Sequence, residues 1–352
     1  MRIKSMSWLA ILLVLLLTAA LVAGCGGGQQ QAAPAEEEAE TEGEEAAPAQ
    51  EGPVTVEENY PTRTIEVINQ FGPGGGTDIF VRGIAVPATK ILRQSIVPIS
   101  VTGGGGVASY DAFLQAPADG YTLRAIGPEQ VVNHVMGRED LAQMVPVIRC
   151  QFDQSMLLVS TESQFKTIQD VVDYAKANPG KLTVGGTDAA GYDEVLVNLW
   201  AKEAGIEVKY VPFAAASEAN AAILGGHIDV IHEEAGPMKA LIDGDKVRPL
   251  VIFMEERADM FPDVPTGKEL GWEITIGRWR GFAVKVGTPE QYITILYEAF
   301  AKAMEDPIYK TMEQENLLNL RPGLLGPEEF KAFIEEEVKV YDEVLRSIGL
   351  VK

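Results

Sequence analysis

The chain has 352 residues, 46% of them apolar, which suits about two globular domains and excludes a disordered chain. Its 29 Lys and Arg residues stand against 51 Asp and Glu residues, and the net charge of −22 argues against nucleic acid or anionic lipid as a partner. Two cysteines are too few for a disulfide scaffold or a four-cysteine zinc site.

Residues 1–24 have the features of a secretory signal peptide. Arg2 and Lys4 precede an apolar segment, 8–22, which is shorter than the roughly 20 residues that cross a bilayer. Cys25 directly follows Val-Ala-Gly, a sequence that resembles a bacterial lipobox. We therefore expect residues 1–24 to be removed and Cys25 to be lipidated, so that acyl chains hold the protein at a membrane. A plain signal peptide with an incidental cysteine is the alternative.

Residues 25–59 are rich in Gln, Ala, Pro, Gly and Glu, and they hold too few large apolar side chains to stabilise a fold. We predict a disordered acidic tether. Residues 1–58 carry a net charge of −8, which leaves −14 for the rest of the chain. This acidic charge is interpreted either as an ordinary solvated surface or as an electrostatic filter against anionic partners. If Cys25 is lipidated, Cys150 has no cysteine partner, and we expect it to pack as a small buried hydrophobe.

From Tyr60 onward, expected strands alternate with expected helices. The strands cover 65–71, 96–101, 121–126, 156–159, 182–184, 208–210, 228–231, 249–253 and 281–286. The helices cover 79–92, 108–114, 168–177, 194–204, 218–224, 238–242, 289–304 and 327–348. This alternation predicts the α/β class with largely parallel sheets, and two such units would form a ligand cleft between them.

Two glycine-rich segments follow predicted strands. In the segment 71–78, glycines allow close approach of main-chain N–H groups, and the start of the next helix adds a positive dipole, as a carboxylate or phosphate requires. The P-loop lysine is absent, and Thr77 stands where a dinucleotide fingerprint has its third glycine. A tight turn with Thr77 or Asp78 as the N-cap is an equal alternative. In the second segment, 103–106, a flexible loop is favoured over close backbone approach to a ligand.

Catalytic and metal-binding motifs are not recognisable. His227 and His232 are five residues apart, which does not suit one helical face, and His134 stands alone. Cys150 has no partnered base in any known motif, and a Gly-x-Ser-x-Gly elbow is missing. The segment 232–234, His-Glu-Glu, is interpreted as a loop of solvated charge rather than as part of a cleft. These observations favour a binding protein without metal or cofactor over an enzyme.

Short motifs occur in order along the body. They are Tyr60-Pro61-Thr-Arg63-x-Ile65, Gly74-Gly75-Gly76-Thr77-Asp78 followed by Arg82, Pro117-Ala-Asp119-Gly120-Tyr121-Thr122-Leu123, Asn178-Pro179-Gly180-Lys181-Leu182, Val211-Pro212-Phe213, Leu224-Gly225-Gly226-x-Ile228-Asp229-Val230, Phe261-Pro262-Asp263-Val264-Pro265-Thr266, Trp279-Arg-Gly281 and Gly287-Thr288-Pro289. In this order and spacing, from Tyr60 almost to the C-terminus, the chain resembles the extracytoplasmic solute receptors of tripartite tricarboxylate transporters, often called Bug receptors.

The resemblance implies an α/β, two-lobed, periplasmic-binding-protein-like (type II) fold with a hinge and an interdomain cleft. Lobe 1 would contain residues 60–158 and 281–352, and lobe 2 would contain residues 159–280. The implied function is that of a monomeric extracytoplasmic lipoprotein, in the periplasm or on the outer face of the cell membrane. It would capture a small organic acid and deliver it to membrane permease subunits. A ligand-sensing receptor for a membrane signalling kinase is the alternative.

Ligand-binding residues are expected on the loops that border the cleft. They are Phe71, Gly74, Gly75, Gly76, Thr77, Asp78, Glu129, Thr187, Asp188, Phe213, Glu233 and Trp279. The chain departs from the family pattern at Phe213-Ala214-Ala215, where Tyr-Lys-Gly is usual and a cation is therefore lost. If Asp78, Glu129, Asp188 and Glu233 all line the cleft, they would repel a tricarboxylate. The expected ligand is then a monocarboxylate, an amino acid or another amine-bearing solute rather than citrate.

Overall fold

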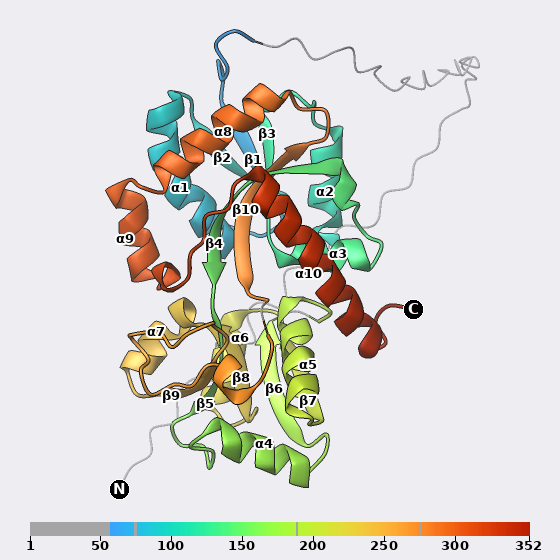
Figure 1. Cartoon of the computed structure of the whole chain (residues 1–352), viewed down its shortest axis with the longest axis vertical. Helices are drawn as coiled ribbons and strands as arrows, with labels where there is room; N and C mark the ends of the chain where they lie inside the picture. The colour runs from blue at the N-terminus through green and yellow to red at the C-terminus, as the bar shows by residue number, and fades with distance from the viewer. Residues whose placement is uncertain (1–56, 74–75, 188, 275) are drawn as a thin grey trace, which may run out of the picture. The chain divides into compact units, whose positions relative to one another are not determined.

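A computed structural model describes residues 57–73, 76–187, 189–274 and 276–352, all within the unit Glu51–Lys352. The predicted signal peptide, Cys25 and nearly all of the predicted tether lie outside these residues. The described part of the chain forms two α/β lobes, each built on a five-stranded sheet (Figure 1). Among the helices of that part, none has the length and apolar character needed to cross a membrane.

The sheet of lobe 1 has the strand order β2-β1-β3-β10-β4. Its strands are β1 (Ile65–Asn69), β2 (Ile96–Ser100), β3 (Thr122–Ile126), β4 (Met144–Asp153) and β10 (Arg278–Lys285). Strand β1 pairs in parallel with β2 and β3, whereas β10 pairs antiparallel with β3 and β4. The helices of this lobe are α1 (Gly76–Leu92), α2 (Val107–Gln115), α3 (Pro128–Val135), α8 (Glu290–Ala303), α9 (Pro307–Glu315) and α10 (Pro327–Ser347).

The sheet of lobe 2 has the order β7-β6-β8-β5-β9. Its strands are β5 (Ser155–Ser160), β6 (Leu182–Thr187), β7 (Val208–Phe213), β8 (Val230–Glu234) and β9 (Val247–Ile252). Its helices are α4 (Ile168–Ala177), α5 (Tyr192–Ala204), α6 (Ala216–Leu224) and α7 (Ala235–Asp243). Strand β5 pairs antiparallel with β8 and β9, whereas β6 pairs in parallel with β7 and β8. Four strands of each sheet run in the same direction, as expected for largely parallel sheets, and the fourth strand in each order, β10 or β5, runs opposite to them.

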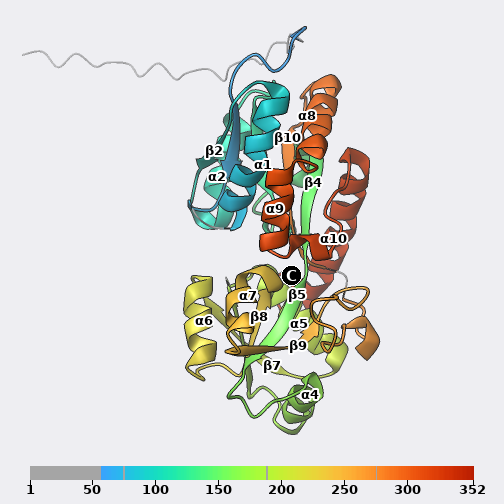
Figure 2. The same cartoon turned by 90° about the vertical axis from the view of Figure 1, so that its left-hand side faces the viewer.

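Two strand segments carry the chain between the lobes. Strand β4 of lobe 1 leads through Gln154 directly into β5 of lobe 2, and β10 brings the chain back (Figure 2). Gln154 is buried, and its Nε2 donates a hydrogen bond to the Leu317 carbonyl oxygen at 3.3 Å. The boundary expected after residue 158 falls inside β5, which belongs to the lobe 2 sheet.

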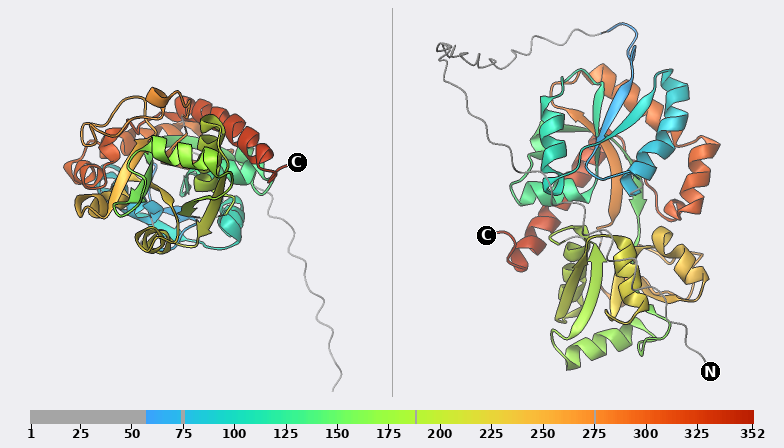
Figure 3. Two further views of the ribbon diagram at one scale, coloured as in Figure 1. Left: turned by 90° about the horizontal axis from the view of Figure 1, so that it is seen from below. Right: turned by 180° about the vertical axis from the view of Figure 1, so that it is seen from behind.

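Helix α10 reaches from lobe 1 to lobe 2 (Figure 3). It packs against β4 and α3 and then against α5, where Lys202 Nζ and Glu343 Oε1 are 2.6 Å apart. Pro327 at its first turn and Glu329, whose carboxylate accepts from the Gly326 N–H, define its start.

Both faces of each sheet are covered, which explains why strands such as β5 are almost continuously apolar. One core cluster runs along one face of both sheets and contains Trp200 and Trp279. Two further clusters lie on the opposite faces, one around Phe282 in lobe 1 and one around Ile231 in lobe 2. Cys150 is a buried free thiol in the lobe 1 cluster, which confirms the prediction for it. Burial raises the pKa of this thiol.

Three elements were not predicted. Helix α3 follows Gly127, with Pro128 as its first helical residue, and Gln130 Oε1 accepts from the Gly127 N–H at 2.7 Å. Strand β4 contains buried polar residues, so its sequence lacks a clear apolar pattern. Helix α9 is short and polar, and it is capped by Asp306, which accepts from the Ile308 N–H at 2.9 Å.

Candidate functional site

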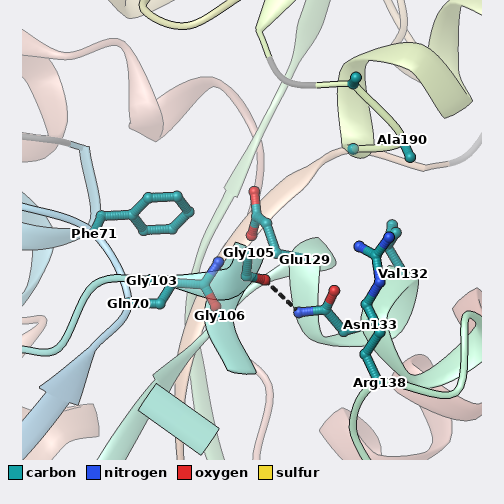
Figure 4. A pocket seen from close by; sticks show the side chains of 12 residues that line it. Gln70, Phe71, Gly103, Gly105, Gly106, Glu129, Val132, Asn133, Arg138 and Ala190 are labelled. Atoms are coloured by element: carbon teal, nitrogen blue, oxygen red, sulfur yellow. Dashed lines mark hydrogen bonds between the residues drawn. The ribbon is translucent and has the colours of Figure 1, made fainter. Parts of the chain in front are cut away.

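Loops from both lobes line a pocket of about 240 Å³ (Figure 4). Lobe 1 contributes the end of β1, the glycine run before α2, helix α3 and the turn after it, and lobe 2 contributes the turn before α5. The lining residues are Gln70, Phe71, Gly103, Gly105, Gly106, Glu129, Val132, Asn133, Arg138, Ala189, Ala190 and Gly191. A ligand in this pocket would contact both lobes.

The glycine run 103–106 forms a tight turn against the end of β1. Its four residues have φ angles of 132°, 60°, 64° and 105°, a region in which side chains other than glycine are strained. A Cβ atom on Gly106 would lie 2.5 Å from Gln70 Oε1 and 3.0 Å from Asn133 Nδ2. Glycine is required in this run because the backbone approaches its neighbours closely. This close packing replaces the interpretation of the run as a flexible loop.

Three amide side chains, those of Gln70, Gln130 and Asn133, fix the lobe 1 side of the pocket. Gln130 Nε2 donates to Gln70 Oε1 at 2.6 Å, and Asn133 Nδ2 donates to the Gly105 carbonyl oxygen at 2.8 Å. Gln130 and Asn133 both lie on α3 and are buried. The glycine turn is thus held between β1 and α3, with its geometry set before any ligand arrives.

Arg278, the first residue of β10, joins carboxylates from both lobes. Its guanidinium pairs with Glu129 of lobe 1, with Asp193 Oδ1 of α5 at 2.9 Å and with Glu234 Oε1 of β8 at 3.0 Å. It also lies over the Tyr192 ring, 4.7 Å from the centroid. Burial alone would lower the pKa of Arg278, but Glu234, Glu129 and Asp193 outweigh it and raise that pKa. We call Arg278 with these three carboxylates the interlobe hub.

Asp193 is buried, but its neighbours hold the pKa of its carboxyl group below the usual value. Its Oδ2 accepts hydrogen bonds from the Thr187 N–H at 2.6 Å and the Thr187 hydroxyl at 2.8 Å, and His232 Nδ1 lies 3.4 Å from its Oδ1. Burial would raise the pKa of Asp193, but His232, Arg278 and the Thr187 hydrogen bond outweigh burial and lower the pKa. Thr187 therefore orients the carboxylate of Asp193, which belongs to the interlobe hub.

The segment 232–234 is not a solvated loop, contrary to the sequence interpretation. All three residues belong to β8 and are buried beside the hub. Burial, and then the nearby Glu234, raises the pKa of Glu233 well above its usual value, and the same two causes raise the pKa of Asp153. Ligand atoms of Asp193, His232 and Glu234 lie within 4.8 Å of one another, but the Arg278 guanidinium already pairs with both carboxylates, so we assign no metal site there.

The structure brings some of the predicted site residues together and separates others. Phe71 and Glu129 line the pocket. Gly74, Gly75 and Asp188 lie outside the described residues. Gly76, Thr77, Asp78, Thr187, Phe213, Glu233 and Trp279 are described, but they do not line this pocket.

Two of these residues have other partners. Asp78 is 3% exposed, and its Oδ2 accepts from Arg82 Nε at 2.9 Å. Trp279 is fully buried among aromatic rings and donates through Nε1 to Glu337 Oε2 at 3.2 Å. Asp78 pairs with Arg82, whereas Glu129 shares Arg278 with Asp193 and Glu234, so the expectation that acidic residues repel a tricarboxylate stays a prediction.

Four residues that build the site were missed from the sequence: Gln70, Asn133, Arg138 and Arg278. Asn133 and Arg138 lie in the unpredicted helix α3 and in the turn that follows it. Arg278 directly precedes the Trp279-Arg-Gly281 motif, and this adjacency was the available signal. Its three carboxylate partners are far away in the sequence, so their pairing could not be inferred.

Comparison with known proteins gives a consistent result. The model of the tripartite tricarboxylate transporter family receptor matches residues 80–350. The chain is 30% identical to the UPF0065 protein in the gbd 5′ region of Cupriavidus necator, over 84% of this chain and 90% of that protein.

Two solved structures have the same fold. A TctC solute binding protein from Polaromonas, without ligand, has 26% identity and a TM-score of 0.71, covering 82% of this chain and 99% of its own. Rpa4515 of R. palustris, solved with adipate, has 23% identity and a TM-score of 0.72, covering 82% of this chain and 98% of its own. The protein therefore belongs to the tripartite tricarboxylate transporter receptor family, a family of solute-binding receptors.

Proposed function

We propose that the protein is an extracytoplasmic lipoprotein that captures a small organic acid and delivers it to a tripartite tricarboxylate-type membrane transporter. The observation that carries this proposal is the pocket lined by loops of both lobes. A ligand that contacts both lobes stabilises the closed arrangement by its differential affinity, and the transporter would recognise that arrangement.

A carboxylate suits the chemistry of this pocket. The Gly103–Gly106 turn brings main-chain groups close to the ligand space, and α5 begins beside it at Gly191 without a side-chain cap. The N-terminal N–H groups of a helix favour an anion. The adipate bound by the R. palustris neighbour supports the same ligand class.

Binding without chemical change is part of the proposal. The described residues that line the pocket include no serine, cysteine or histidine, and so no nucleophile with an adjacent base. Cys25, after the lipobox-like sequence, would carry the acyl chains, and the acidic segment up to residue 59 would hold the receptor away from the membrane surface.

Thermal-shift titration of the purified receptor domain, residues 57–352, tests the proposal. A panel of succinate, L-malate, adipate, citrate and L-glutamate should contain at least one acid that raises the unfolding midpoint, because a ligand that binds only the native state stabilises it. The bound acid should be recovered unchanged after long incubation. The proposal fails if no acid in the panel binds or if the acid is converted to another compound.

A further inference from the structure

The charge of the pocket depends on one arginine. Glu129 and Arg138 are the charged residues among its described lining, and the Glu129 carboxylate is paired with Arg278, which it shares with Asp193 and Glu234. Arg138 is exposed, and its guanidinium forms no hydrogen bond or ion pair with the residues that the structure describes. Among the described lining residues, Arg138 therefore offers an entering acid a guanidinium that is not already paired with a carboxylate.

The local structure explains why the neighbouring acid does not neutralise Arg138. Glu139 is buried and holds Arg124 through two hydrogen bonds, of 2.7 Å and 2.9 Å. The Glu139 carboxylate also accepts from Asn133 Nδ2 at 2.9 Å. Glu139 thus points into lobe 1, while the adjacent arginine faces the pocket (Figure 4).

The backbone places Arg138 beside the glycine turn. Helix α3 ends at Val135, Gly137 has a φ angle of 71°, and the Arg138 N–H donates to the Asn133 carbonyl oxygen at 2.8 Å. Asn133 also bonds to Gly105, so one residue fixes both the turn and the arginine. A Cβ atom on Gly105 would lie 3.9 Å from Arg138 Nη1.

We propose that Arg138 pairs with an acid group of the ligand and thereby determines its specificity and orientation. The acid group would lie between Arg138 with the glycine turn on lobe 1 and the start of α5 on lobe 2, and the less polar end would face Phe71. This inference rests on the proposed function. A planar guanidinium matches a carboxylate in two-point geometry, which an exposed lysine or an amide does not.

The test uses Arg138→Gln and Arg138→Lys, with Arg93→Gln as the matched control. Arg93 is an exposed arginine after α1 that does not line the pocket. Its replacement by Gln changes the net charge by the same amount as Arg138→Gln, but at a site away from the pocket. The probes are succinate, L-malate and adipate, each paired with its uncharged diamide. Because Arg138 is exposed, unfolding midpoints without ligand should be equal in all four proteins.

For any acid that binds the wild type, Arg138→Gln should weaken affinity roughly tenfold to a hundredfold, as expected for loss of a charge-assisted hydrogen bond. The affinity of Arg138→Lys for the acid should lie between those of the wild type and Arg138→Gln, and the affinity of Arg93→Gln should stay within about twofold of the wild type. The preference for the acid over its diamide should shrink in Arg138→Gln, which a purely structural role would not produce.

Three results would overturn the inference. Equal affinity of the wild type and Arg138→Gln would exclude pairing while leaving the receptor function intact. An equal loss of affinity for the acid and its diamide would assign Arg138 to the shape of the turn. A change confined to the association rate and abolished by high salt would show steering rather than contact. If the wild type binds none of the acids, both this inference and the proposed function fail.

Discussion

Arg278 and Glu129 form an ion pair that connects the strand returning from lobe 2 with the rim of the ligand pocket on lobe 1. The same guanidinium holds Asp193 and Glu234 of lobe 2. The pocket and the contact between the lobes are therefore parts of one charge network. A change in the separation of the lobes would alter these contacts, and we expect this network to link ligand binding to lobe movement.

Replacing Arg278 with Gln should destabilise the protein strongly. Removal of one partner from a buried ion pair leaves the other charges uncompensated, which costs about 3–5 kcal/mol. Urea unfolding measures the loss, and Arg257→Gln is the control, because Arg257 forms an exposed ion pair with Glu269 that is worth about 1 kcal/mol or less. Equal stability of the two variants would contradict the assignment of Arg278 as the interlobe hub.

Replacing Gly106 with Ala should disturb the pocket. Its φ angle of 105° strains any side chain, and the new Cβ would displace Gln70 from its hydrogen bond with Gln130. We expect a loss of about 1–3 kcal/mol in the free energy of unfolding and about tenfold weaker acid binding.

Gly180→Ala is the control for backbone strain. Gly180 has a φ angle of 68°, and a Cβ there would meet nothing within 4 Å. This variant should lose about 1 kcal/mol of stability and keep its affinity for the acid. If both variants bind the acid equally well by calorimetry, the glycine turn is not part of the site.

Much of the local structure follows from short-range signals in the sequence. Helix α4 was predicted with its observed bounds, 168–177, and the structure adds a capping box of Thr167 and Asp170 at its start. The alternation of strands and helices gave the class, and the family motifs gave the two-lobed fold. Helix α9 and strand β4 were missed because a short polar helix and a strand with buried Arg149, Gln151 and Asp153 lack periodic apolar patterns.

The candidate site was less predictable than the fold. Phe71 and Glu129 were identified because they follow predicted strands. The interlobe hub depends on residues far apart in the sequence, and a lone arginine such as Arg138 gives no signal until Glu139 is seen to pair with Arg124. The side chains of β8 were assigned to solvent because charged residues are seldom buried without partners, and Arg278 supplies that partner for Glu234.

Glu337 should make stability dependent on pH. Burial raises its pKa from 4.5 to about 8, although the Trp279 hydrogen bond and the charges of Arg321 and Arg149 oppose the shift. The folded state therefore binds a proton that the unfolded state has released. The contribution to stability is complete below about pH 4.5 and is lost as the pH rises through about 8.

Urea unfolding of the wild type and Glu337→Gln between pH 5 and pH 8 measures this effect. Across that range the wild type should lose up to about 1.4 kcal/mol per pH unit relative to the variant, whose amide does not titrate. Parallel pH profiles for the two proteins would show that Glu337 does not hold a proton in the folded state.

Replacing Cys25 with Ser should release the protein from the membrane. If the proposed lipidation occurs at this thiol, its loss removes the acyl chains that would hold the protein at the bilayer. Metabolic labelling with an alkyne fatty acid and membrane fractionation measure the loss, and Cys150→Ala is the control, since that thiol is buried. Retained labelling in Cys25→Ser would contradict lipidation at this cysteine.

A crystal structure with a bound acid from the panel tests the central claim most directly. The account predicts an unaltered acid in the pocket, with its carboxylate between the Gly105 turn and the start of α5 beside Gly191, and with contacts to both lobes. An acid bound elsewhere, held by one lobe alone, or converted into another compound would contradict the account.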